Sequence, residues 1–184
     1  MSIRSINGDP DLQQLGADIV AAAYLKGDFI LSSGRHSNYY FDKYLFETQP
    51  SILKRLGRCL ADLVPAETQL LAAPELGAVL LGAAVSMELG LPLALVRKDG
   101  KDYGTAKLVE GTEPQNGAKV TVIEDILTTG GQAVRAAEKV REAGAVVLRL
   151  VAVVDREEGA AEAFARAGLA YTPLFRKSDL HLPE

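Results

Sequence analysis

The sequence predicts an α/β protein with a central, mainly parallel sheet flanked by helices and a small N-terminal hood. From Pro50 onward, segments with helical spacing of apolar residues alternate with short apolar segments, which is typical of a parallel sheet with crossover helices. Two of the short segments are continuously apolar, as strands covered on both faces require: Val120, Val122 and Ile123, and Val146 to Leu148. The chain of 184 residues has the length of one ordinary domain. We expect a single domain over residues 1–184, with the hood at about 1–48 and the core at about 49–176.

The composition limits the class of protein and its partners. Hydrophobic residues make up 48% of the chain, enough for a core, and the net charge of -4 argues against a general nucleic-acid surface. The single cysteine excludes an intramolecular disulfide, and two histidines argue against a structural metal site. The chain shows no signal-peptide pattern, and Pro74, Glu75 and Glu88 interrupt its most apolar window, residues 71–96. We expect a cytoplasmic protein without a nucleic-acid or membrane partner.

The hood is predicted from one helix and two short strands. Asp9 before Pro10 is a helix start, because Asp caps the first turn and Pro fits its first position. Apolar residues then recur at helical spacing until Gly27. Residues 29–31 and 39–44 are predicted strands on either side of a segment rich in turn residues. These two strands predict a hairpin.

The core is predicted as alternating strands and helices. Apolar spacing gives helices at residues 52–63, 77–89, 131–143 and 157–167. The intervening apolar segments give strands at residues 69–73, 93–96, 119–123 and 146–154.

A phosphate-binding loop is predicted between the strand at 119–123 and the helix at 131–143. Thr128, Thr129, Gly130 and Gly131 lie where backbone amides, hydroxyls and a helix N-terminus can surround an anion. Glu124 and Asp125 would repel that anion, and they suit a neighbouring group with hydroxyls, such as a ribose. A phosphate beside a diol indicates a ribose 5-phosphate. The alternative is an ordinary strand-to-helix turn with solvated acids.

A basic, glycine-punctuated segment lies at residues 97–111. It carries Arg97, Lys98, Lys101 and Lys107, and a loop of this length is commonly functional or mobile. We interpret it as a lid over the anion site. The alternative is a solvated hairpin in which nearby acids offset the cations.

The segment from Val122 to Gly131, VIEDILTTGG, resembles the phosphoribosyl pyrophosphate motif of the type I phosphoribosyltransferases. Within that family the resemblance is strongest to the orotate-specific members. It extends to three further segments: Phe29 to Asp42, Val96 to Gly104 with Glu110 and Gly111, and Val154 to Arg156. The resemblance implies a type I phosphoribosyltransferase-like fold and transfer of the phosphoribosyl group to orotate, giving orotidine 5'-monophosphate and pyrophosphate in pyrimidine biosynthesis. It also implies Mg²⁺, bound mainly through phosphoribosyl pyrophosphate rather than by protein ligands, and a homodimer whose lid residues act across the interface.

The same resemblance implies the site residues. Lys101 and Asp125 are the implied catalytic residues, and Tyr40, Phe41, Thr128 and Arg156 the implied orotate-binding residues. The implied phosphoribosyl pyrophosphate contacts are Arg97, Lys98, Lys101, Tyr103, Glu124, Asp125, Ile126, Leu127, Thr128, Thr129, Gly130, Gly131 and Gln132.

Some of these positions have an alternative role or differ from the family pattern. Strand alternation predicts that only one of Tyr40 and Phe41 faces the ligand. Arg156, implied to hold the orotate carboxylate, has a surface ion pair with Glu157 or Glu158 as its alternative role. Tyr103 stands where many family members have His, and Ser32 and the Pro74 to Gly77 segment lack lysines that some members carry.

The sequence alone also allows two other functions. A purine phosphoribosyltransferase would share the phosphate loop and the basic lid. A regulator of the same fold would bind nucleic acid and sense phosphoribosyl pyrophosphate, but the acidic chain does not favour it.

Overall fold

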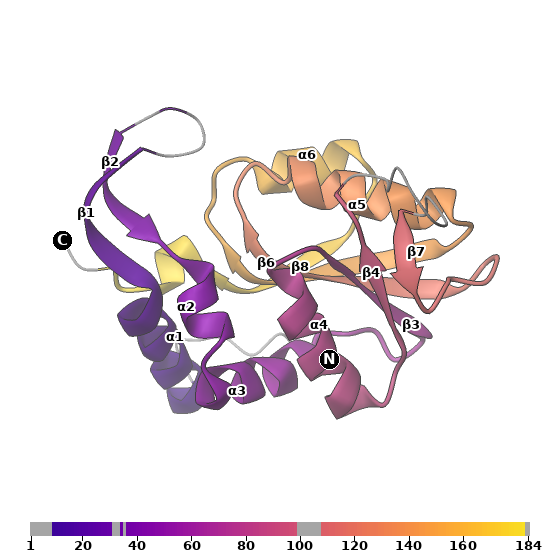
Figure 1. Ribbon diagram of the computed structural model, residues 1–184, viewed down its shortest axis with the longest axis horizontal. Helices are drawn as coiled ribbons and strands as arrows, with labels where there is room; N and C mark the ends of the chain where they lie inside the picture. The colour runs from indigo at the N-terminus through magenta and orange to yellow at the C-terminus, as the bar shows by residue number, and fades with distance from the viewer. Residues whose placement is uncertain (1–8, 31–33, 35, 99–107, 183–184) are drawn as a thin grey trace.

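The computed structural model describes residues 9–30, 34, 36–98 and 108–182, and its core is one six-stranded sheet (Figure 1). The strand order is β5-β4-β3-β6-β7-β8, with all neighbours parallel except the antiparallel edge pair β4 and β5. The strands are β3 (Leu70–Pro74), β4 (Leu93–Val96), β5 (Val109–Gly111), β6 (Lys119–Leu127), β7 (Val146–Asp155) and β8 (Tyr171–Arg176). The mainly parallel sheet is confirmed.

Helices cover both faces of this sheet, as Figure 1 shows. One face packs against α1 (Pro10–Ala23), α3 (Pro50–Ala61) and α4 (Ala78–Leu89), where Leu15, Leu56 and Leu81 meet Leu71 and Ile123. The other face packs against α5 (Gly131–Glu142) and α6 (Ala160–Arg166). Buried apolar side chains on both sides explain why the central strands are mostly apolar.

The N-terminal segment forms a helix and a hairpin. The carboxylate of Asp9 accepts hydrogen bonds from the backbone N–H groups of Asp11 and Leu12, so the predicted cap is confirmed. Strands β1 (Tyr24–Ile30) and β2 (His36–Phe41) pair antiparallel in a separate two-stranded sheet. The helix ends at Ala23 rather than near Gly27, because Tyr24 is already extended and pairs with Phe41.

Other boundaries differ from the prediction for local reasons. The predicted strand at 39–44 ends at Phe41, because the Asp42 carboxylate caps a short helix, α2 (Lys43–Glu47). Helix α6 begins at Ala160 rather than at residue 157, since Glu157 and Gly159 have positive φ angles of 59° and 111°. The edge strands β5 and β8 and the short 3-10 helix η2 (Lys177–Asp179) were not predicted.

The apolar window at residues 71–96 consists of β3, α4 and β4, as predicted. None of the helices in the described part of the chain has both the length and the apolar character needed to cross a membrane. The division into a hood at 1–48 and a core at 49–176 stays a prediction.

Candidate active site

A pocket of about 1070 Å³ opens at the carboxyl ends of the parallel strands, between the sheet and the β1-β2 hairpin. Ligands of open α/β sheets bind at this end, where helix N-termini and loops converge. The pocket wall consists of Leu25, Phe29, Ile30, Tyr40, Phe41, Asp42, Lys43, Pro74, Glu75, Glu124, Asp125, Ile126, Leu127, Thr128, Thr129, Gly130, Gly131, Gln132, Ala133, Arg135, Arg156 and Glu158.

The predicted phosphate loop forms one side of this pocket. It joins the end of β6 at Leu127 to the start of α5 at Gly131, and Thr128 and Thr129 are exposed there. Gly130 has φ of 77°, a left-handed conformation that glycine adopts without strain. Loop amides, two hydroxyls and the N-terminus of α5 therefore border one space, a geometry suited to a monophosphate.

Arg135 adds a positive charge that the sequence analysis missed. It lies one helical turn after Gly131 and lines the pocket. Its Nη1 is 3.6 Å from the point where a Cβ on Gly131 would lie. The spacing of four residues from the loop glycine was the available signal, because residues at i and i+4 share a helix face.

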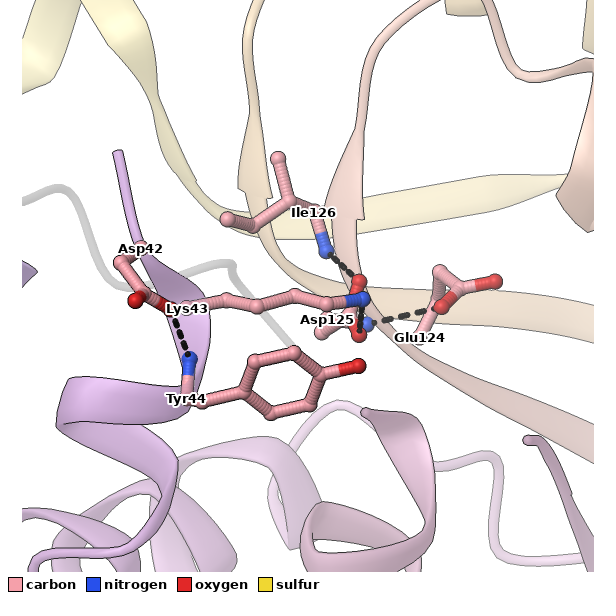
Figure 2. Close-up of polar contacts among 6 residues, drawn as sticks. All are labelled: Asp42, Lys43, Tyr44, Glu124, Asp125 and Ile126. Carbon is pink, nitrogen blue, oxygen red and sulfur yellow. Dashed lines mark hydrogen bonds and ion pairs between the residues drawn. The ribbon is translucent and has the colours of Figure 1, made fainter. Parts of the chain in front are cut away.

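The two acids at the end of β6 are buried beside the loop, and Figure 2 shows their contacts. Asp125 Oδ2 lies 2.5 Å from Nζ of Lys43, which extends from α2. Asp125 Oδ1 accepts a hydrogen bond from the backbone N–H of Ile126 at 2.5 Å. Glu124 Oε1 accepts from the backbone N–H of Asp125 at 3.1 Å. The Asp125 carboxylate is thus fixed through both oxygens.

Burial and neighbouring charges shift the pKa values of Glu124 and Lys43. Burial, with the neighbouring Asp125 charge, raises the pKa of Glu124 to about 8, so Glu124 is mainly a neutral acid at pH 7. Burial opposes the charge of Lys43, but the Asp125 carboxylate outweighs it and raises the Lys43 pKa. Glu124 can therefore donate a proton in a hydrogen bond.

Arg156 follows β7 and also reaches the pocket. Its Nη2 lies 2.8 Å from Glu158 Oε1, so the alternative ion pair exists, and the same guanidinium remains part of the pocket wall. Glu157 instead accepts hydrogen bonds from the backbone and hydroxyl of Ser178.

Tyr40 and Phe41 form the aromatic wall of the pocket. The Tyr40 ring lies 5.6 Å from that of Phe29, and the Phe41 ring lies 6.3 Å from that of Phe46. Both residues line the pocket, and that only one of them faces the ligand stays a prediction. They stand at the end of β2, where the chain turns into α2.

Arg97 and Lys98, the first residues of the predicted lid, are held by polar contacts beside the pocket and do not line it. Arg97 Nη1 lies 3.7 Å from Glu75 Oε2, and the backbone N–H of Lys98 donates to Glu75 Oε1 at 2.7 Å. Lys139 Nζ donates to the carbonyl oxygens of Arg97 and Lys98 at 2.8 and 2.5 Å. Lys101 and Tyr103 lie outside the described residues, as does Ser32.

Protein side chains alone do not assemble a metal site in the described ranges, where no group of three His, Cys, Asp or Glu residues is placed to hold an ion. The Asp125 carboxylate nevertheless offers the hard oxygen atoms that Mg²⁺ prefers. This donor set fits an ion that a phosphorylated ligand carries into the pocket.

Comparison with known proteins points to one family. The model of the phosphoribosyl transferase domain matches residues 46–165. An orotate phosphoribosyltransferase of Methanocella arvoryzae is 48% identical over 154 residues, which are 84% of this chain and 87% of that protein.

Solved structures agree. The orotate phosphoribosyltransferase of Mycobacterium tuberculosis H37Rv in complex with Fe(III) dicitrate has a TM-score of 0.84 at 32% identity, covering 94% of this chain and 100% of that one. A crystal structure of the M. tuberculosis protein in complex with 5-phospho-alpha-D-ribosyl 1-diphosphate has a TM-score of 0.80 at 31% identity, with coverage of 94% and 100%.

Proposed function

The chain belongs to the orotate phosphoribosyltransferase family, and from that premise we propose how its pocket carries out the reaction. The protein is a transferase that moves the 5-phosphoribosyl group from phosphoribosyl pyrophosphate to orotate. The products are orotidine 5'-monophosphate, in pyrimidine synthesis, and pyrophosphate. The roles of individual residues below are part of the proposal.

The loop from Thr128 to Gln132 binds the 5'-phosphate of the substrate, with Ile126 and Leu127 shaping its entry. The observation that carries this assignment is the convergence of loop amides, two hydroxyls and the N-terminus of α5 on one pocket. The buried acids next to the loop accept and donate hydrogen bonds to the ribose hydroxyls. Arg135 adds charge on the phosphate side.

Orotate lies at the opposite side of the pocket. Arg156 holds its carboxylate, a task for which a guanidinium is suited because it offers paired donors. The Thr128 hydroxyl contacts the base, and the rings of Tyr40 and Phe41 pack against its flat face. The proximity of these groups in one pocket supports this placement.

The transfer forms a bond between an orotate ring nitrogen, which releases its proton to solvent, and the anomeric carbon as the bond from that carbon to pyrophosphate breaks. Positive charge develops on the ribose, and the Asp125 carboxylate stabilises it by its own charge. The lid cations Arg97, Lys98 and Lys101, with Tyr103 as a hydrogen-bond donor, neutralise the departing pyrophosphate. Mg²⁺, when bound with the substrate, supplies further charge neutralisation of the phosphates.

We also propose that the protein is a homodimer with lid residues acting across the interface. Apolar side chains exposed on and beside α2 and α4 support an interface there: Tyr44, Leu45, Leu76, Leu80 and Met87. The cytoplasmic location and the lack of a nucleic-acid partner stay predictions.

A spectrophotometric assay tests the function. With phosphoribosyl pyrophosphate and Mg²⁺ present, orotate absorbance should fall with stoichiometric release of pyrophosphate, and adenine and xanthine should not be consumed. Consumption of a purine in place of orotate would instead identify the alternative acceptor.

The variant Arg156→Gln tests the orotate site. The KM for orotate should rise about 10- to 100-fold, the effect of one hydrogen bond to a charged group. Arg166→Gln, an exposed arginine of α6, is the matched control and should keep the KM. An unchanged KM in Arg156→Gln would remove Arg156 from the site.

A further inference from the structure

Lys43 reaches the acid pair from a part of the chain 82 residues away. It is the first residue of α2, and its ammonium lies 2.5 Å from Asp125 Oδ2. The side chain of Asp125 is only 4% exposed, whereas that of Lys43 is 31% exposed toward the pocket that both residues line. Figure 2 shows the extended Lys43 side chain pointing at Asp125.

The surroundings of Asp125 are rich in carboxyl groups. Glu47 lies one turn after Lys43 on α2 and is fully buried, and neither of its carboxylate oxygens has a hydrogen-bond partner among the described residues. Burial, with the Asp125 charge, raises the pKa of Glu47 to about 8. Glu124 is buried on the other side of Asp125. In the described chain, Lys43 is the cation paired with this group of three acids.

Gly77 closes the site from the N-terminus of α4. A Cβ at Gly77 would lie 2.0 Å from Asp125 Oδ2 and 2.7 Å from Lys43 Nζ. A side chain at this position would therefore overlap the ion pair. The sheet, α2 and α4 approach closely around one contact, and the backbone N–H of Ile126 holds the second Asp125 oxygen.

We propose that Lys43 is a positioning residue for the phosphoribosyl transfer, one that holds the Asp125 carboxylate in place and directed at the ribose hydroxyls. This inference rests on the proposed role of Asp125 in holding the ribose. Without the Lys43 ammonium, Asp125 would lie between two buried acids with no opposing charge. The Asp125 side chain would then be free to rotate, and the ribose would lose a hydrogen-bond acceptor.

The test is a double-mutant cycle on binding of phosphoribosyl pyrophosphate with Mg²⁺, measured by calorimetry without orotate. Lys43→Met and Asp125→Asn should each weaken binding about tenfold or more, as expected for loss of a hydrogen bond to a charged group. The double variant should bind like Asp125→Asn alone, within about twofold, because Lys43 acts only through Asp125. Lys43→Arg should recover most of the affinity.

Lys54→Met, an exposed lysine on α3, is the matched control and should bind as the original protein does. Thermal denaturation shows whether each variant is folded. Should Lys43→Met fail to fold, comparison of the double variant with Asp125→Asn decides, since both charges are then absent.

Two results would overturn the inference: normal binding by Lys43→Met, or a further loss of affinity when Lys43→Met is added to Asp125→Asn. The second result would mean that Lys43 touches the ligand or supports the fold at large. Failure of the proposed function has a separate signature, since Asp125→Asn alone would then bind phosphoribosyl pyrophosphate normally.

Discussion

The buried side chain of Glu47 makes the stability of the protein depend on pH. Its pKa is raised from 4.5 to about 8 by burial, so between these values the folded protein keeps a proton that the unfolded chain has lost. The free energy of unfolding therefore falls as pH rises through that window. Glu124 has a raised pKa of about 8 and contributes with the same sign.

The variant Glu47→Gln should flatten this pH dependence. Near pH 5 its Tm should match that of the original protein, and near pH 9 it should be more stable by on the order of a few kcal/mol, since the amide has no proton to lose. Thermal denaturation from pH 5 to 9 measures the difference. Parallel Tm curves for the two proteins would show that Glu47 is ionised in the fold at neutral pH.

Individual site residues differed in how far sequence could predict them. Glu124, Asp125 and the Thr128 to Gly131 loop lie in one short segment, so the sequence predicted them together. The structure places all of them in one pocket. Lys43 and Glu75 carry no local signature. Lys43 joins Asp125 only because α2 packs beside the end of β6. The Glu75 carboxylate contacts Arg97 and Lys98 in the segment where this chain lacks a lysine that the family resemblance implies for some members.

At the scale of elements, the turn from β6 into α5 combines fold and function. Gly130 has φ of 77°, and a Cβ there would lie 3.1 Å from Cα of Ala160 on α6. The glycine thus lets the phosphate loop turn and lets α6 pack close behind it. A side chain at position 130 would therefore strain the loop and also disturb its packing against α6.

The variant Gly130→Ala should lose about 1–2 kcal/mol of stability and bind phosphoribosyl pyrophosphate at least several-fold more weakly, because the loop amides must reorient. Gly90→Ala is the matched control. Gly90, at the end of α4, also has a left-handed φ, 66°, but a Cβ there would meet no atom of the described residues within 4 Å. It should lose similar stability and keep its affinity. Equal affinity in both variants would argue against phosphate binding by this loop.

The periodic spacing of apolar residues predicted most helices and strands. The remaining strand segments form because they pair with neighbouring strands. Strand β6 continues through the acids to Leu127 because Ile126 and Leu127 pair with Val154 and Asp155 of β7. Strand β8 contains Pro173, which is unfavourable in a strand interior but tolerated at the edge of this sheet. Strand β5 has three residues and exists through its pairing with β4. Such strands depend on partners that a local pattern does not contain.

At the scale of the whole molecule, the pocket draws on both the hairpin and the sheet. Residues from Leu25 in β1 to Glu158 after β7 line it, so the site exists only when these parts are packed together. The fold class followed from alternation of strands and helices. The closure of the hairpin over the sheet did not, because it depends on long-range contacts such as that between Lys43 and Asp125.

The exposed apolar side chains on α2 and α4 predict association of two copies. The protein should elute at twice its mass of 19.6 kDa, and Met87→Glu, at a side chain 79% exposed, should shift it toward the monomer. Light scattering after size-exclusion chromatography measures both. Val146→Glu, at an exposed position on β7, is the control and should stay dimeric. If the original protein were fully active as a monomer, the proposed interface would be wrong.

The central claim is that the turn between β6 and α5 holds the phosphate of a phosphoribosyl ligand while Asp125 and Glu124 hold its ribose. A crystal structure with bound orotidine 5'-monophosphate tests it most directly. We predict the phosphate within hydrogen-bond distance of backbone amides at residues 128–132, the ribose hydroxyls at the two acids and the base carboxylate at Arg156. A phosphate bound elsewhere, with this turn and the acids free of ligand, would contradict the claim.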